Sequence, residues 1–219
     1  MKSFFKIRSS AMMIAVLTLA ISFLSCKKDD KGVLRIKATH STLTIEDAKM
    51  QPPQGENTLI WDIAGHTPVV APDGHQLTLG EFNKAQGYGE VKCINTGTHV
   101  TLHFKGLIPN GVYTVWTVTF QPPGFEETLS NVIGIGALGP GDGSQNSFTA
   151  SPAGTASLST TMPAGTMSEF GSVGPCLGSE FEIQFWTIYH MDGLTHGGSP
   201  GPESTWVLQS LFQFRGSQL

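Results

Sequence analysis

The chain has 219 residues, with 13 lysines and arginines against 17 aspartates and glutamates, and a formal net charge of −4 at pH 7. An acidic surface repels phosphate backbones, which argues against nucleic acid as a partner. Hydrophobic residues make up 39% of the chain and aromatic residues 9%, which is enough for a packed core and argues against global disorder.

The first 25 residues have the layout of a secretory signal peptide. Lys2, Lys6 and Arg8 form a basic start without acids, and an uncharged, mostly apolar run follows at residues 11–24. That run is shorter than the about 20 apolar residues that a membrane-spanning helix needs. We therefore expect residues 1–25 to be removed on export. The remaining chain carries 10 basic and 17 acidic residues, a formal charge of −7.

The signal peptide ends in Phe-Leu-Ser-Cys at residues 23–26, which resembles the lipobox of bacterial lipoproteins. The resemblance implies that Cys26 is acylated, with chains such as palmitate, and that residues 26–32 tether the protein to a membrane. The Lys-Lys-Asp-Asp run after this cysteine resembles the surface-export tag of some outer-membrane lipoproteins. We therefore expect a lipid-anchored protein of the cell envelope, in the outer membrane and exposed on its surface. The alternative is an ordinary signal peptide with a chance cysteine.

Residues 33–219 predict one all-β domain, since short runs rich in β-branched and aromatic residues alternate with Gly, Pro, Asn and Asp. The expected fold is a single antiparallel β-sandwich, jelly-roll or immunoglobulin-like. Residues 79–86 predict one or two helical turns. The predicted strands cover residues 33–39, 58–63, 99–105, 112–120, 132–138, 156–161, 181–190 and 206–215.

Alternation within two strands predicts which face is buried. Residues 99–104 place Val, Leu and Phe on an inward face and His99 and His103 on the opposite face. Residues 181–185 place Phe, Ile and Phe inward and Glu182 and Gln184 outward. The Pro-Asn-Gly run at 109–111 tolerates positive φ, so it predicts a hairpin that joins residues 99–105 to residues 112–120.

Two cysteines remain once Cys26 is lipidated. Disulfides persist in the oxidising compartments outside the cytosol, so we expect Cys93 and Cys176 to form a disulfide bond. The alternative is two separate buried thiols, because a sequence does not give the separation of the two Cα atoms.

Four stretches resemble a group of uncharacterised secreted proteins of bacteria and archaea. They are APDGHQLTLGEF at 71–82, GLIPNGVYTVW at 106–116, GALGPGDGSQNSFTA at 136–150 and YHMDGLTHGGSPGPE at 189–203. The resemblance implies a compact exported β domain. It implies no activity, cofactor or catalytic residue.

The most promising site is the loop that follows residues 181–190. His190, Asp192 and His196 offer two imidazoles and one carboxylate within seven residues, and Zn²⁺ and Cu²⁺ both accept nitrogen and oxygen ligands. The alternative is structural: His190 bonds to backbone, Asp192 begins a turn and His196 is solvated. His99 and His103 are about 13 Å apart along a strand, so they could add one ligand at most.

Other kinds of site have weaker support. Asp142, Ser144 and Asn146 alternate like oxygen ligands of Ca²⁺, but the glutamate of a calcium loop is missing and a glycine-rich turn explains them better. The chain has no GxSxG nucleophile motif and no phosphate-binding glycine loop. The four tryptophans lie on predicted strands, where Trp is more often core than binding platform.

Three functions remain open. The first is a non-catalytic binding module for a glycan, a protein or another envelope component. The second is a metal-binding protein or metal-dependent enzyme that uses His190, Asp192 and His196, with Zn or Cu as its cofactor. The third is a structural component of the envelope.

Overall fold

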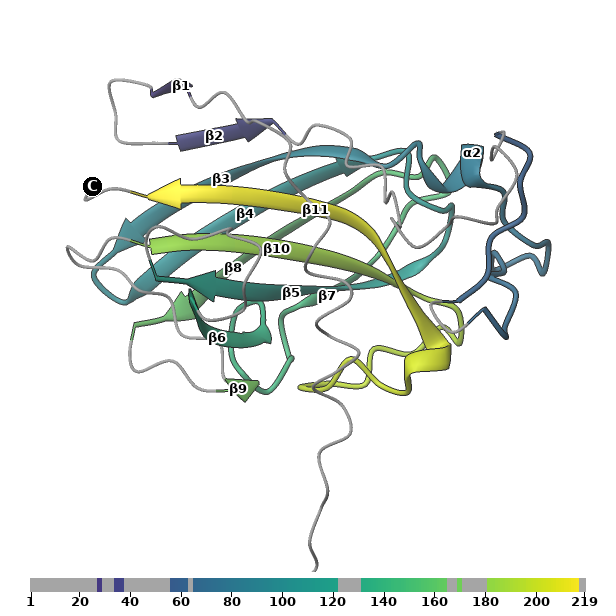
Figure 1. The fold of residues 1–219 in the computed structure, drawn as a ribbon. Coiled ribbons are helices and arrows are strands. Elements are labelled where there is room, and N and C mark those ends of the chain that lie inside the picture. The colour runs from purple at the N-terminus through teal and green to yellow at the C-terminus, as the bar shows by residue number, and fades with distance from the viewer. Residues whose placement is uncertain are drawn as a thin grey trace, which may run out of the picture.

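The computed structural model describes residues 27–28, 34–37, 56–62, 65–121, 131–164, 169–170 and 181–216. These residues form an antiparallel β-sandwich of two sheets, as the alternation of apolar and polar residues predicts (Figure 1). The signal peptide, Cys26 and Cys176 lie outside the described residues. Within them, no helix is long and apolar enough to cross a membrane.

The first sheet has the strand order β1-β2-β3-β4-β8 and the second has the order β11-β10-β5-β6-β9, with β7 paired to β5. The described strands pair antiparallel except β6 and β9, which are parallel. The first sheet contains β1 (Lys27–Lys28), β2 (Leu34–Lys37), β3 (Gln86–Ile94), β4 (Gly97–Lys105) and β8 (Ala156–Pro163). The second contains β5 (Val112–Phe120), β6 (Val132–Ala137), β7 (Ser147–Thr149), β9 (Glu169–Phe170), β10 (Phe181–His190) and β11 (Trp206–Gly216).

Within the described residues, two short helices lie in the connections. Helix α2 (Leu79–Phe82) falls within the predicted helical segment, and Thr78 and Glu81 cap its start by bonding to each other's backbone N–H groups. A 3-10 turn, η2 (Glu203–Thr205), leads directly into β11.

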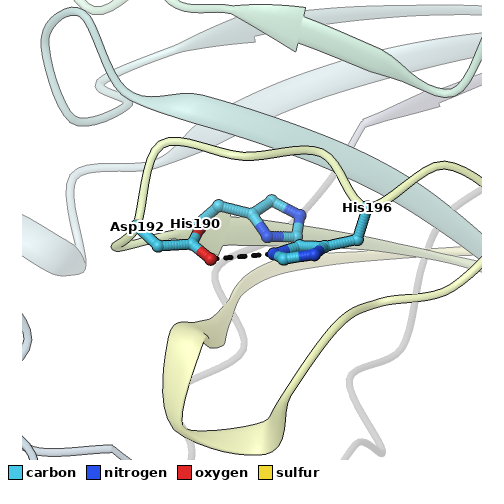
Figure 2. A group of neighbouring side chains, drawn as sticks. All are labelled: His190, Asp192 and His196. Atoms are coloured by element: carbon cyan, nitrogen blue, oxygen red, sulfur yellow. Dashed lines mark hydrogen bonds and ion pairs between the residues drawn. The ribbon is translucent and has the colours of Figure 1, made fainter.

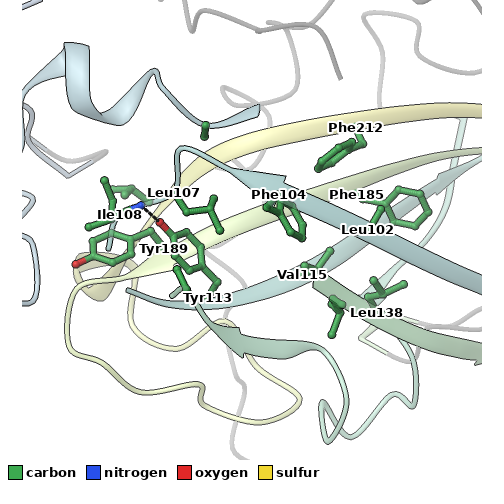
Figure 3. Close-up of a cluster of buried hydrophobic side chains, with 14 of the residues drawn as sticks. Leu102, Phe104, Leu107, Ile108, Tyr113, Val115, Leu138, Phe185, Tyr189 and Phe212 are labelled. Carbon is green, nitrogen blue, oxygen red and sulfur yellow. Dashed lines mark hydrogen bonds between the residues drawn. The ribbon is translucent and has the colours of Figure 1, made fainter. Parts of the chain in front are cut away.

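The main core lies between the two sheets (Figure 3). Phe104 of β4 meets Phe212 of β11 edge to face, with ring centroids 5.5 Å apart, so aromatic side chains of both sheets interlock. The predicted inward face of β4 is confirmed. The fully buried side chains with the largest volumes include Leu102, Tyr113, Phe185, Tyr189, Phe212 and Phe214.

The predicted hairpin between β4 and β5 is wrong. β4 pairs with β3 and β8, whereas β5 pairs with β10, β6 and β7, so the connection at 106–111 carries the chain from one sheet to the other. Leu107 and Ile108 explain this, because both are buried in the main core, where a tight hairpin turn would expose them. The predicted positive φ is present at Asn110, at 59°.

Strand β3 was not predicted because glycines interrupt its sequence. A Cβ at Gly87 would lie 2.8 Å from Cζ of Phe212, and a Cβ at Gly89 would lie 2.8 Å from Cδ2 of Leu102. These two glycines therefore make room for a core side chain of the facing sheet, Phe212, and for one of the neighbouring strand, Leu102. The predicted strand at 58–63 is instead a segment of isolated bridges at Leu59 and Trp61, and Trp61 is 52% exposed rather than part of the core.

The second sheet is buried on its outer face too, as the loss of alternation at residues 186–189 predicts for the end of β10. Glu182 and Gln184 point to that face but are only 6% exposed. They share it with a second apolar cluster, in which Trp186 lies opposite Trp116 in the β10–β5 register. His190 is on the same face, at the end of β10. A histidine in this position is enclosed by the sheet rather than solvated.

Candidate metal site

The candidate site is the loop between β10 and β11, at residues 191–205. Its ends are fixed by the sheet, since His190 is the register partner of Val112 on β5 and of Trp206 on β11. The backbone N–H of Met191 donates to the carbonyl of Thr205 at 2.8 Å and closes the base of the loop. The loop therefore starts from rigid β-structure, which places its first side chain accurately.

The three side chains predicted to form a ligand set do come together (Figure 2). One ligand atom from each of His190, Asp192 and His196 lies within 4.8 Å of the other two. Nε2 of His196 and Oδ2 of Asp192 are 2.8 Å apart and share a hydrogen bond. A tetrahedral ion with bonds of about 2.1 Å holds its ligand atoms about 3.4 Å apart, so a modest closure of the group would complete such a site.

A side chain orients the ring of His190. The structural alternative, in which the ring bonds to backbone, is therefore wrong at this residue. It is 1% exposed, and its Nε2 lies 2.8 Å from Oγ1 of Thr114. The indole N–H of Trp116 donates to the same hydroxyl oxygen at 2.8 Å. The other ring nitrogen of His190, Nδ1, is buried and has no hydrogen-bond partner among the described residues. Buried polar groups in folded proteins are usually satisfied by protein, ordered water or an ion, so Nδ1 is available to a ligand.

The electrostatics keep His190 neutral and Asp192 ionised. Burial lowers the pKa of His190 to about 4, and the proximity of His196 adds to this while the charge of Asp192 opposes it. Burial raises the pKa of Asp192, but bonds from the N–H of Leu194 and from His196 outweigh it, so this pKa falls below its usual value. A neutral imidazole and an ionised carboxylate are the forms that bind metal ions.

His196 adopts an unusual backbone conformation. Its φ is +56°, in the left-handed region that costs a residue with a Cβ roughly 1–2 kcal/mol. Its side chain is 21% exposed, so it is mostly covered. The structural alternative predicts a solvated His196 and does not describe this side chain. Such strain persists where the surrounding structure holds a residue in place, and it is enriched at functional sites.

Glycines shape the space around His196. A Cβ at Gly201 would lie 2.5 Å from Cδ2 and 2.8 Å from Nε2 of the imidazole, so any larger residue there would displace the ring. On the other side, a Cβ at Gly143 would lie 2.0 Å from the carbonyl oxygen of Gly197. The glycine-rich turn at 139–146 therefore packs directly on the loop that carries His196.

The turn at 139–146 does not look like a calcium loop. Oδ1 of Asp142 accepts the N–H of Ser144 at 2.9 Å, which is ordinary turn chemistry. Asn146 is fully buried, whereas Asp142 and Ser144 are exposed. The interpretation as a glycine-rich turn is therefore favoured.

His99 and His103 do not join the site, because they lie on β4 in the opposite sheet. Nδ1 of His99 is 2.9 Å from Oγ1 of Thr161, and the ring of His103 stacks on Tyr88 with centroids 4.6 Å apart. The group of three has no further His, Cys, Asp or Glu member in the part of the chain that the structure describes.

One half of the predicted disulfide lies within the described residues. Cys93 is on β3, partly buried against the main core, and it is not a free thiol. Because Cys176 lies outside the described residues, the pairing of these two cysteines stays a prediction.

Two residues of the site were not found by reading the sequence. Thr114 lies in the middle of a strand of alternating Thr and apolar residues, so nothing marks it as the partner of a histidine 76 positions later. Gly201 belongs to a run of glycines and prolines that predicts only a turn. Thr114 could be found only with knowledge of the register between β5 and β10, and Gly201 only with the conformation of the loop.

Comparisons with known proteins assign no family to this chain. No family model matches it, and no curated protein matches it. The function of this protein is therefore inferred from the residues of the site.

Proposed function

We propose that this protein is an exported, membrane-anchored β-sandwich that binds a divalent transition metal ion, Zn²⁺ or Cu²⁺, through His190, Asp192 and His196. The observation that carries the proposal is the convergence of these three side chains within 4.8 Å. Nitrogen and carboxylate ligands suit both ions. Two histidines and one carboxylate also form the facial triad of non-haem Fe²⁺ sites, so Fe²⁺ belongs in the test.

Three further features support a ligand site rather than a simple turn. Nδ1 of His190 is buried and lacks a partner in the described part of the chain. Its other nitrogen contacts Thr114, and a metal ion on Nδ1 selects the tautomer in which Nε2–H donates to that hydroxyl. His196 is held in the left-handed backbone region, which residues with a Cβ seldom adopt. Turn chemistry does not explain the buried nitrogen of His190 or its orientation by Thr114.

The direct test is the metal content of the purified full-length chain. We expect about one equivalent of Zn, Cu or Fe per chain, measured by elemental analysis after dialysis against metal-free buffer. His196→Ala should lose this metal and keep the fold, because a loop position of this kind contributes little core burial. His99→Ala is the matched control and should retain it.

Failure to bind any of the three ions, or equal metal content in His196→Ala, would reject the metal site. The binding module for a glycan, a protein or another envelope component would then be the leading function. Binding of such a partner by metal-free protein would support that function directly.

We also propose that Cys26 anchors the protein in the outer membrane, exposed on the cell surface. The support is the sequence, namely the apolar run at 11–24 and the lipobox-like residues 23–26. Two or more acyl chains give stable attachment where one gives marginal binding. Cys26→Ala should release the protein from the membrane fraction or leave the signal peptide uncleaved, and unchanged fractionation would contradict the proposal.

A disulfide between Cys93 and Cys176 completes the proposed exported protein. It would close a loop of about 80 residues, for which the chain-entropy model gives roughly 4–5 kcal/mol of stabilisation. Mass spectrometry of a digest without reductant should find the two cysteine peptides linked. Alkylation of both thiols in the native oxidised protein would contradict the pairing.

A further inference from the structure

This inference rests on the metal site proposed above and concerns what else the metal binds. Structural zinc sites have four protein ligands, whereas sites with chemistry or exchangeable ligands have three and an open position. The group at the end of β10 contains two histidines and one aspartate, and within the described residues no fourth ligand of these types joins it. The fourth position is therefore available to a ligand from solution.

The charge of the site favours an anion in that position. A divalent ion contributes two positive charges, the Asp192 carboxylate removes one, and the imidazoles of His190 and His196 bind metals in their neutral form. The bound site would carry a net charge of about +1. An oxyanion would neutralise this charge, and hard oxygen donors are accepted by Zn²⁺, Cu²⁺ and Fe²⁺.

Trp206 offers a hydrogen-bond donor beside the site. It is the register partner of His190 across β10 and β11, so the two side chains lie on the same face of the sheet, about 5 Å apart at their Cβ atoms. The indole Nε1–H of Trp206 is buried and makes no hydrogen bond to any described residue. Leaving such a group unsatisfied is unfavourable, and an acceptor oxygen would remove that cost.

Access from solvent is also present. Asp192 and Leu194 are exposed on the loop, and Leu194 has 58% of its surface open to water. His190 and Trp206 lie at the base of the same loop. A small ligand would reach the metal from this exposed side of the loop.

We propose that the metal keeps one exchangeable position that binds an oxyanion, a carboxylate or a phosphate group, with the Nε1–H of Trp206 donating to the same ligand. The site is then a receptor for an acidic small molecule or for an acidic group on a larger envelope component. Acetate tests for a carboxylate ligand, and inorganic phosphate tests for a phosphate ligand.

The test uses the full-length chain loaded with Co²⁺, whose visible spectrum reports changes in coordination. We expect acetate, phosphate or both to change the spectrum with saturation, whereas chloride at the same ionic strength should not. Trp206→Phe keeps an aromatic ring and removes the N–H, so it should weaken oxyanion binding about tenfold and leave the affinity for Co²⁺ unchanged. Trp61→Phe, at an exposed tryptophan, is the matched control.

Each outcome separates this inference from the proposed function. If Co²⁺ binds stoichiometrically but neither anion alters the spectrum, the coordination sphere is full and the inference is overturned while the metal site stands. If Co²⁺ does not bind, the metal site itself fails. If Trp206→Phe lowers Co²⁺ affinity or leaves oxyanion affinity unchanged, the role of the indole is overturned. Should that variant not fold, the response of the wild type to the anions still decides the exchangeable position.

Discussion

The clusters of histidine and carboxylate around His75 and around His190, both in the described part of the chain, behave differently. In the first, the ring of His75 lies between Asp73 and Glu81, and each of its nitrogens bonds to one carboxylate. In the second, the single carboxylate of Asp192 bonds to the imidazole of His196, and Nδ1 of His190 has no hydrogen-bond partner within the described chain. The composition of the two clusters is similar, but only the second has a nitrogen to give to a metal ion.

Solvent exposure separates the two clusters further. The side chain of His75 is 47% exposed, whereas His190 is 1% exposed. The hydrogen bond that the imidazole donates to Asp73 is the main cause that raises the pKa of His75, while burial lowers the pKa of His190 to about 4. The first cluster thus favours a protonated imidazole, which repels metal ions. The second favours a neutral one, which binds them.

The contact between Thr114 and His190 is the sharpest way to break the second cluster without touching a ligand. Thr114→Val should lower the affinity for the metal by about 10–100-fold, the range typical of partners that orient a metal-binding histidine. The measurement is a competition titration with a chromophoric chelator. Thr117→Val removes a buried hydroxyl from the same strand, and Thr117 does not contact His190, so it should leave metal affinity unchanged. Equal losses in both variants would mean that the effect is general destabilisation.

The glycines of the loop test whether the position of His196 matters. In Gly201→Ala the new Cβ would collide with the imidazole, and a strain of about 1.4 kcal/mol is enough for a tenfold loss of metal affinity. Gly193→Ala is the matched control, because it also has positive φ but nothing lies within 4 Å of the added Cβ. Both variants should lose similar thermal stability, and Gly201→Ala alone should lose metal. Full metal affinity in Gly201→Ala would show that His196 is not a ligand.

The sequence was sufficient for the fold class and for the three members of the second cluster. Alternation found the inward face of β4, and local spacing found the three side chains that converge because all three lie within seven residues. The sequence did not predict which strands pair. A turn with Pro, Asn and Gly predicts a hairpin, but the burial of Leu107 and Ile108 makes it a crossing between sheets. That burial depends on long-range packing.

The residues that surround the site could not be predicted from the sequence for the same reason. Thr114 meets His190 only because β5 pairs with β10, and Trp206 meets it only because β11 pairs with β10. Glycine is depleted in strands, so Gly87 and Gly89 do not indicate one. In the structure they accommodate Phe212 and Leu102. In each case, a residue that looks ordinary in the sequence acquires its role from a neighbour on another strand.

The first cluster should show a small and purely electrostatic effect. Since the pKa of His75 is raised in the folded protein, its protonated form stabilises the fold below its ordinary pKa of 6.5, and this contribution disappears as the pH rises through the raised value. His75→Gln should therefore lower the melting temperature by no more than about 2 °C at about pH 5 and have no effect at about pH 9, because exposed ion pairs contribute little. Thermal unfolding at the two pH values measures this difference. The variant should also keep the full metal content of the wild type, since neither nitrogen of His75 is available to an ion. A stability loss of equal size at both pH values would show that the charge of His75 is not the cause. Any loss of metal would show that the first cluster also contributes to metal binding.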